Sequence, residues 1–229
     1  MKTVSGGNCV YLAIMAMVLI AVGCGKKPVV ETSQHTIVFF GDSVTAGYGV
    51  KEGTSFYDRI ANVMEKGVYG NVITYNAGVS GDDTNEALMR ISKVKAMNPD
   101  IIVIAFGLND CQSSGITPRQ YIANIRLILS QMPRETRPVL ATSNTFMDTG
   151  QELWTNLNRK LEPYMEELRT LAHEGNYPLI DVNDVWKDQI RSDSRNMENL
   201  YVDPTHPSSA GHKLIYETYM TVLRRVIMQ

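Results

Sequence analysis

The sequence predicts an α/β fold, a three-layer α/β/α sandwich built around a five-stranded parallel sheet. Five short apolar runs alternate with amphipathic stretches that are long enough to form helices. The central run, residues 101–106, is apolar throughout, as is typical of a parallel strand that is covered on both faces. The chain has 229 residues, a net charge of -2 and 44% hydrophobic residues, a composition typical of one large globular domain. This balance excludes a basic nucleic-acid scaffold and an acidic disordered chain.

The apolar runs supply the predicted strands, in chain order residues 36–40, 72–75, 101–106, 139–143 and 179–182. The stretches between and after them supply the predicted helices, residues 54–66, 83–97, 118–132, 151–173 and 208–228. Thr117 and Pro118 are a typical start for one of these helices, as a capping residue and a proline in the first turn. Asp82 or Asp83 is expected to cap the helix over 83–97, and Ser208 or Ser209 the last helix.

The first residues are predicted to be a targeting segment that precedes the folded domain. Residues 10–22 are wholly apolar, and Lys2 is the only charged residue before Lys26. Such a run is short for a membrane span but typical of a signal peptide. We therefore expect a signal peptide over residues 1–23, a polar tether over 24–35 and the catalytic or binding domain over 36–229.

The end of this segment resembles the lipobox of bacterial lipoproteins, because small residues precede Cys24 directly after the apolar run. The resemblance implies cleavage before Cys24, lipidation of its thiol, and an exported protein that a lipid anchor holds at the membrane. A simple secretory signal and an uncleaved membrane anchor are the alternatives. If Cys9 is removed and Cys24 is lipidated, Cys111 is the only cysteine left, and no internal disulfide can form.

Polar and glycine-rich turns follow three of the predicted strands. Ser43 follows the first, Gly81 the second and Asn109 the third. Ligands of such sheets bind beyond the carboxyl ends of the strands, so these residues are expected near one crevice. Each turn alone is compatible with ordinary turn chemistry, and the turn over residues 41–49 also with a phosphate-binding loop of flavodoxin type.

Asp203 and His206 lie in a proline-stiffened turn just before the last helix. At this spacing a carboxylate can reach Nδ1 of the imidazole, orient the ring and stabilise its protonated form. His35 and His173 each precede a strand and belong at the opposite edge of the sheet, whereas His212 lies inside the last predicted helix. His206 is therefore the candidate base.

Four blocks of the sequence resemble, in order, the four blocks of the SGNH/GDSL hydrolase superfamily. They are Gly41-Asp42-Ser43, Gly81, Gly107-x-Asn109-Asp110 and Asp203-x-x-His206. The resemblance implies a flavodoxin-like SGNH hydrolase fold and an enzyme that hydrolyses carboxylic esters.

By this resemblance Ser43, His206 and Asp203 form a catalytic triad, with Ser43 as the nucleophile. The backbone N–H groups of Ser43 and Gly81 and the side-chain amide of Asn109 would form the oxyanion hole. The resemblance implies no cofactor and no metal, and the scattered cysteines and histidines do not predict a zinc site. The expected partners are an ester substrate, lipid-like or an acetylated carbohydrate, and the membrane, but no nucleic acid.

The loops over 48–55, 111–117, 144–151 and 184–202 are expected to rim the pocket. Seven apolar residues in and near these loops are candidates for an acyl groove, for loop packing or for a sugar-stacking surface: Phe146, Met147, Trp154, Trp186, Met197, Leu200 and Tyr201. Cys111 is expected to be a buried spectator near the site. The alternative function is a non-catalytic, flavodoxin-like lipoprotein that holds a phosphate or a nucleotide.

Overall fold

The computed structural model describes residues 34–113 and 115–229. The predicted signal peptide over residues 1–23, the predicted lipidation site Cys24 and most of the predicted tether over 24–35 lie outside the described residues. Within the described ranges, no helix is both long and apolar enough to cross a membrane.

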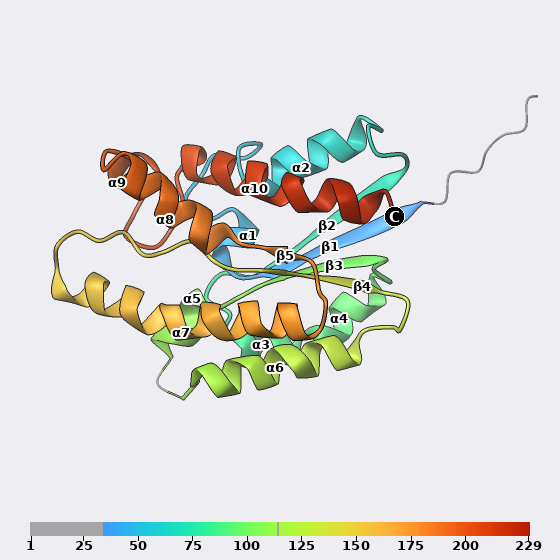
Figure 1. Ribbon diagram of the computed structural model, residues 1–229. Coiled ribbons are helices and arrows are strands. Elements are labelled where there is room, and N and C mark those ends of the chain that lie inside the picture. Colours follow the sequence, from blue (N-terminus) through green and yellow to red (C-terminus); the bar gives the residue numbers. More distant parts are fainter. Residues whose placement is uncertain (1–33, 114) are drawn as a thin grey trace, which may run out of the picture. The chain divides into compact units, whose positions relative to one another are not determined.

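The predicted α/β fold is confirmed, since five parallel strands form one sheet in the order β2-β1-β3-β4-β5 (Figure 1). The strands are β1 (His35–Gly41), β2 (Val72–Gly78), β3 (Ile101–Ala105), β4 (Arg137–Ala141) and β5 (Leu179–Ile180). Their bounds differ from the predicted ones by up to three residues. β5 ends early because the side chain of Asp181 already caps the following helix.

Helices cover both faces of the sheet (Figure 1). In chain order they are α1 (Ser43–Ala46), α2 (Phe56–Glu65), α3 (Thr84–Met89), α4 (Ile91–Ala96), α5 (Leu108–Gln112), α6 (Pro118–Gln131), α7 (Glu152–Glu174), α8 (Val182–Ser192), α9 (Asn196–Asn199) and α10 (Ser209–Ile227). The expected caps are present, since the side chains of Thr117, Asp83 and Ser208 accept backbone hydrogen bonds at the starts of α6, α3 and α10.

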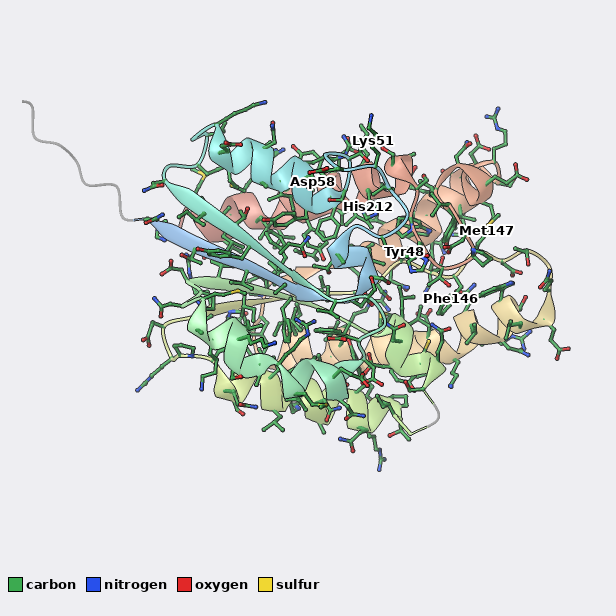
Figure 2. All side chains as sticks on the ribbon, turned by 180° about the vertical axis from the view of Figure 1, so that it is seen from behind. Tyr48, Lys51, Asp58, Phe146, Met147 and His212 are labelled. Atoms are coloured by element: carbon green, nitrogen blue, oxygen red, sulfur yellow. The ribbon has the colours of Figure 1, made fainter. Side chains whose placement is uncertain are left out.

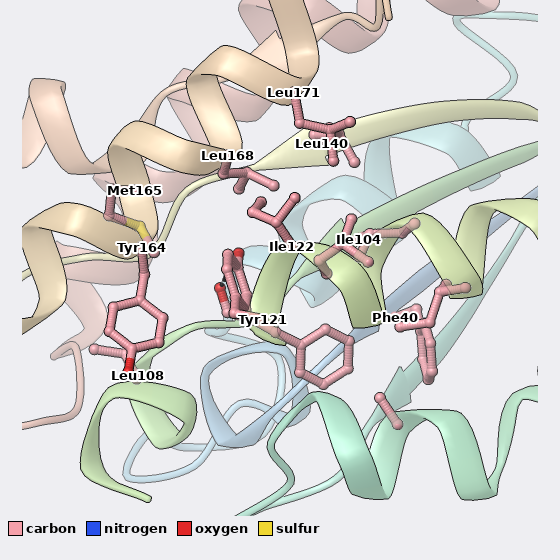
Figure 3. Packing of buried hydrophobic residues seen from close by; sticks show 14 of the residues in the cluster. Phe40, Ile104, Leu108, Tyr121, Ile122, Leu140, Tyr164, Met165, Leu168 and Leu171 are labelled. Atoms are coloured by element: carbon pink, nitrogen blue, oxygen red, sulfur yellow. Dashed lines mark hydrogen bonds between the residues drawn. The ribbon is translucent and has the colours of Figure 1, made fainter. Parts of the chain in front are cut away.

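Two hydrophobic cores lie on opposite faces of the sheet, because successive residues of a strand point to opposite sides. Phe39 and Val103 pack with α2, α8 and α10 on one face. Phe40 and Ile104 face the other side and pack with α3 to α7, as the close view in Figure 3 shows for part of this core. All four side chains are at most 1% exposed. Burial of both faces explains why the central strand reads as an uninterrupted apolar run.

The structure corrects two predictions between the strands. The helix predicted over residues 83–97 is two helices, α3 and α4, because Arg90 has φ -112° and ψ 8° and interrupts the helical backbone. The loop predicted over 184–202 contains α8 and α9. α8 forms because Asp181 caps it and because Val182 and Trp186, spaced by four, are buried against the sheet. The short helices α1 and α5 were not predicted, since four or five residues carry no periodic pattern.

Candidate active site

The turns that follow β1, β2 and β3 leave the sheet at the same level. Gly41, the last residue of β1, is paired in register with Gly78 of β2 and with Ala105 of β3. Ser43, Gly81 and Asn109 follow within two to four residues of these ends. The shared register therefore brings three of the predicted site residues to one edge of the sheet.

Ser43 is the first residue of α1, a four-residue helix that turns sharply away from β1. The Asp42 carboxylate accepts a hydrogen bond from the N–H of Val44 at 2.9 Å, and Gly47 ends the helix at φ 84°, a conformation that suits glycine. Burial raises the pKa of Asp42 to about 7. The Ser43 side chain projects from this turn and the residue is only 6% exposed.

The loop between α9 and α10 brings Asp203 and His206 to this serine. The Ser43 hydroxyl lies 3.0 Å from Nε2 of His206, and Nδ1 of His206 lies 2.8 Å from an Asp203 carboxylate oxygen. Asn144, from the loop after β4, donates its side-chain amide to the carbonyl of Thr205 at 3.0 Å and so braces the histidine loop. Ser43 thus forms one hydrogen-bonded line with two residues that lie about 160 positions further along the chain.

Asp203 lies in an environment that favours its ionised form. Burial acts to raise its pKa, but hydrogen bonds from the Thr205 N–H and from the imidazole and N–H of His206 outweigh burial and lower the pKa below its ordinary value. A carboxylate that remains ionised can orient an imidazole and stabilise its protonated form.

Three candidate donors lie on the turns that leave this edge of the sheet, namely the backbone N–H groups of Ser43 and Gly81 and the side-chain amide of Asn109. The backbone N–H groups of Ser43 and Gly81 have no hydrogen-bond partner within residues 34–113 and 115–229. The Asn109 amide uses one hydrogen to bind the carbonyl of Asp82 at 2.9 Å, which fixes its orientation and leaves the second hydrogen for a ligand. Hydrogen-bond donors of this kind, without another partner, are able to bind a negatively charged oxygen.

Sequence reasoning missed two residues of this region. The ring of Tyr48 lies 4.3 Å, centroid to centroid, from the imidazole of His206, while the residue is 52% exposed. The Arg90 guanidinium donates to the carbonyls of Gly41 and Ala77 at the ends of β1 and β2. The only signal for Arg90 was its charge, since it is the one basic residue between Lys66 and Lys93.

The remaining histidines and Cys111 are placed as predicted. His35 is the first residue of β1 and His173 lies in the last turn of α7, both away from the triad edge, whereas His212 is wholly buried in α10. The Cys111 thiol is buried and donates to the carbonyl of Leu108, and burial raises its pKa to about 12. Such a thiol is protonated at neutral pH and is a poor nucleophile.

Four of the seven apolar residues considered for a groove are largely buried. Phe146, Trp186, Leu200 and Tyr201 are at most 7% exposed, and the indole N–H of Trp186 donates to the Tyr201 hydroxyl at 2.8 Å. A hollow of about 270 Å³ remains beside the histidine loop, between the loop after β4 and helices α8 and α9. Its apolar wall consists of Phe146, Ile190 and Met197.

Figure 2 shows where the rim of the site lies. Tyr48, Phe146 and Met147 all lie toward the end of the molecule at which the strands finish. The Met147 N–H donates to the carbonyl of Pro204 at 2.8 Å, so the loop after β4 contacts the histidine loop directly.

The arrangement does not support the phosphate-binding alternative for the turn after β1. The hydroxyl of Ser43 faces an imidazole, and Asp42, next to it, points its carboxylate back to the N–H of Val44. Among the described residues, no group of three or more histidine, cysteine, aspartate or glutamate side chains is arranged to hold a metal ion.

Comparison with known proteins agrees with the fold. A crystal structure of a lipolytic protein of the G-D-S-L family from Veillonella parvula has a TM-score of 0.70 and 19% identity, covering 83% of this chain and 99% of that chain. A lipase/acylhydrolase from Enterococcus faecalis has a TM-score of 0.69 and 24% identity, covering 85% and 96%. Axe2, an acetylxylan esterase from Geobacillus stearothermophilus, has a TM-score of 0.69 and 20% identity, covering 82% and 94%. No curated protein sequence matches this chain.

The sequence itself carries the assignment to a family. Residues 39–214 match the GDSL-like lipase/acylhydrolase family, a stretch that runs from β1 into α10 and includes all four sequence blocks. The chain therefore belongs to the GDSL-like lipase/acylhydrolase family and is a carboxylic ester hydrolase.

Proposed function

We propose that the protein is a serine esterase in which Ser43, His206 and Asp203 form the catalytic triad. One observation carries the proposal, the continuous contact of the three side chains over 3.0 Å from Ser43 to His206 and 2.8 Å from His206 to Asp203. A serine hydroxyl becomes an effective nucleophile only when a base removes its proton during attack, and His206 lies where it can do so.

The reaction follows from these positions. Oγ of Ser43 attacks the ester carbonyl carbon while His206 takes its proton, which gives a tetrahedral intermediate. His206 then protonates the departing alcohol as the carbon–oxygen bond breaks, leaving an acyl-enzyme on Ser43. Water, deprotonated by His206, attacks the acyl-enzyme and releases the carboxylic acid, so the serine is regenerated.

The oxyanion hole in this proposal consists of the N–H groups of Ser43 and Gly81 and the amide of Asn109. Its support is that the two N–H groups have no other partner in the described part of the chain and that Asn109 is held by Asp82. Donors already aimed at the developing charge need no rearrangement, and one such donor contributes on the order of 10²–10³ in rate.

Two substrate classes are compatible with the rim of this site, acyl esters of lipid type and acetylated carbohydrates. The hollow lined by Phe146, Ile190 and Met197 offers an apolar surface for an acyl chain. The exposed ring of Tyr48 beside His206 offers a face on which a sugar ring can stack. Axe2 and other structurally similar proteins are named as acetylxylan esterases, which favours including acetylated sugars among the tested substrates.

The test is hydrolysis of p-nitrophenyl esters from acetate to palmitate, together with acetylated xylooligosaccharides. Ser43→Ala is expected to lose at least about 10³-fold in kcat on every ester that the native enzyme hydrolyses. Ser130→Ala, on the exposed face of α6, is the matched control and should retain native rates. A fluorophosphonate should label Ser43 in the native protein, as peptide mass spectrometry can determine. Undiminished turnover by Ser43→Ala would refute the proposed mechanism.

We also propose that the enzyme is an exported lipoprotein anchored through Cys24. Its support is the sequence of the first 24 residues, in which a wholly apolar run over 10–22 leads to Ala21-Val22-Gly23-Cys24. Beyond the anchor and the substrate the proposal includes no further partner and no nucleic acid.

A further inference from the structure

The guanidinium group of Arg90 binds three different segments near the proposed oxyanion hole. Its Nε donates to the Asp82 carboxylate at 2.5 Å, one terminal nitrogen donates to the carbonyl of Ala77 at 2.7 Å, and the other donates to the carbonyl of Gly41 at 2.9 Å. The guanidinium carbon also lies 4.6 Å from the centre of the Phe40 ring. The Arg90 side chain is 16% exposed and the Asp82 side chain 11%, so this ion pair is largely shielded from water.

Each of these contacts reaches a segment that carries an oxyanion donor. Gly41 precedes Ser43 by two residues, and its carbonyl also accepts the N–H of Val79, so Arg90 fixes the point where β1 turns into α1. Asp82 follows Gly81 directly, and its backbone carbonyl accepts the Asn109 amide at 2.9 Å. Asp82 therefore links Arg90 to Asn109, because its carboxylate accepts from Arg90 and its backbone carbonyl accepts from Asn109.

We propose that Arg90 is a positioning residue that sets the relative placement of all three oxyanion donors through Gly41 and Asp82. It touches neither the substrate nor the reacting atoms, and the inference rests on the proposed function of Ser43, Gly81 and Asn109. Arg90 stands at the break between α3 and α4, and from there its side chain reaches the carbonyls of Gly41 and Ala77 at the ends of β1 and β2. The planar guanidinium spreads several donors in fixed directions, so it can bind one carboxylate and two carbonyls at once, whereas the three donors of a lysine ammonium all leave one atom.

The decisive variant is Arg90→Lys, which keeps the charge and one contact but loses the fork of donors. We expect kcat to fall on the order of 10²-fold while KM changes by less than about threefold, because donors displaced by a fraction of an ångström bind the transition state less well. Binding of a trifluoromethyl ketone, which forms an oxyanion on the serine, should weaken in parallel with kcat. The pH profile of kcat/KM should keep its native shape, since Arg90 does not contact His206 or Asp203.

The matched control is Arg169→Lys. Arg169 is 20% exposed and binds Asp181 at 2.7 Å, so it is a similarly shielded arginine in an ion pair, but it contacts none of the donor segments. It is expected to lose comparable thermal stability and to keep native kcat and native ketone affinity. An equal loss of activity in both variants would indicate general loosening and overturn the inference.

Two further measurements keep the outcome decisive. If Arg90→Lys does not fold, Asp82→Asn tests the same link between Arg90 and Asn109. A loss of kcat and of ketone affinity without a change in the pH profile of kcat/KM then supports the inference. Rates are expressed per active serine, counted by fluorophosphonate titration. Native kcat per active serine in the folded variant overturns the role of Arg90, whereas turnover that survives Ser43→Ala overturns the proposed function itself, so the two failures are distinguishable.

Discussion

Asp203 is bound to the histidine loop through both the backbone and the imidazole of His206. One carboxylate oxygen accepts the N–H groups of Thr205 and His206, each at 2.8 Å, and the other lies 2.8 Å from Nδ1 of the ring. The two backbone N–H groups hold the carboxylate in place independently of the imidazole, so the ring is oriented by a group that is itself immobilised. The spacing of three residues between Asp203 and His206 makes this double contact possible.

His212 lies in α10, six residues after His206, and has a structural role. Its Nδ1 accepts the N–H of Phe56 at 3.2 Å, and its ring stacks on the Phe56 ring. Both side chains are buried between α2 and α10. Burial, followed by repulsion from Arg59, lowers its pKa to about 4 against a partly opposing effect of Asp58. The folded protein therefore requires this imidazole to be neutral.

This requirement predicts a loss of stability in weak acid. The folded pKa is below the unfolded value, so unfolded chains bind more protons between about pH 6.5 and pH 4, and the free energy of unfolding falls as the pH decreases through that range. At pH 5 the contribution of this one group is a loss of roughly 2 kcal/mol relative to pH 7.5.

Urea unfolding of the native protein and of His212→Gln at the two pH values measures the effect. The variant should be less stable at pH 7.5, but the part of the pH dependence that His212 causes should disappear. His173→Gln, at an exposed position in α7, should retain the native pH dependence. Identical slopes for the native protein and His212→Gln would contradict the assigned pKa.

At the scale of elements, the placement of the nucleophile depends on how α1 packs against the end of β2. A Cβ atom added to Gly78 would lie 2.3 Å from the backbone nitrogen of Ala46 and 2.7 Å from the carbonyl carbon of Thr45. Both contacts are with backbone, which cannot move aside as a flexible side chain can. Gly78 therefore permits α1, and with it Ser43, to lie directly on the sheet.

Gly78→Ala is expected to shift α1 and to reduce kcat on the order of 10²-fold, because Ser43 moves relative to His206. The free energy of unfolding should fall by about 1–3 kcal/mol, as for other overpacked sites. Gly115→Ala is the control, since no atom lies within 4 Å of a Cβ added there. Initial rates and thermal unfolding check both variants, and native kcat in Gly78→Ala would show that α1 is not held in this way.

The elements that sequence patterns predicted are those with long, regular spacing of apolar residues. The five strands and the long helices follow from such spacing, and the site residues Ser43, Asp203 and His206 follow from motifs at strand and helix ends. The break at Arg90 was missed because neither glycine nor proline marks it, and the contacts that Arg90 makes with residues 41, 77 and 82 join segments that are distant in the sequence. Helix α8 was missed although its signal, a capping Asp181 before Val182 and Trp186, was present.

At the scale of the molecule, residues 34–229 would carry out ester hydrolysis, and the proposed lipid anchor at Cys24 would hold the enzyme at the membrane. Cys24→Ser is expected to prevent lipidation and to move the protein from the membrane fraction to a soluble fraction. Cell fractionation and the intact mass of the purified protein measure the change, because the acyl groups add a defined mass. The hydrolysis rate on a soluble p-nitrophenyl ester should remain native, since the proposed triad lies far along the sequence from Cys24, within residues 43–206.

Cys111→Ser is the control for Cys24→Ser, because it removes a buried thiol that the proposed lipidation does not use. This control should remain in the membrane fraction. Membrane association of Cys24→Ser equal to that of the native protein would contradict lipidation at this residue.

Ser43 and His206 are 163 positions apart, and the histidine precedes the last helix, α10. A growing chain thus contains the proposed nucleophile long before it contains the proposed base. If the proposed triad is correct, hydrolysis of a p-nitrophenyl ester is expected only from chains extended past His206, and a chain that stops before Asp203 should be inactive.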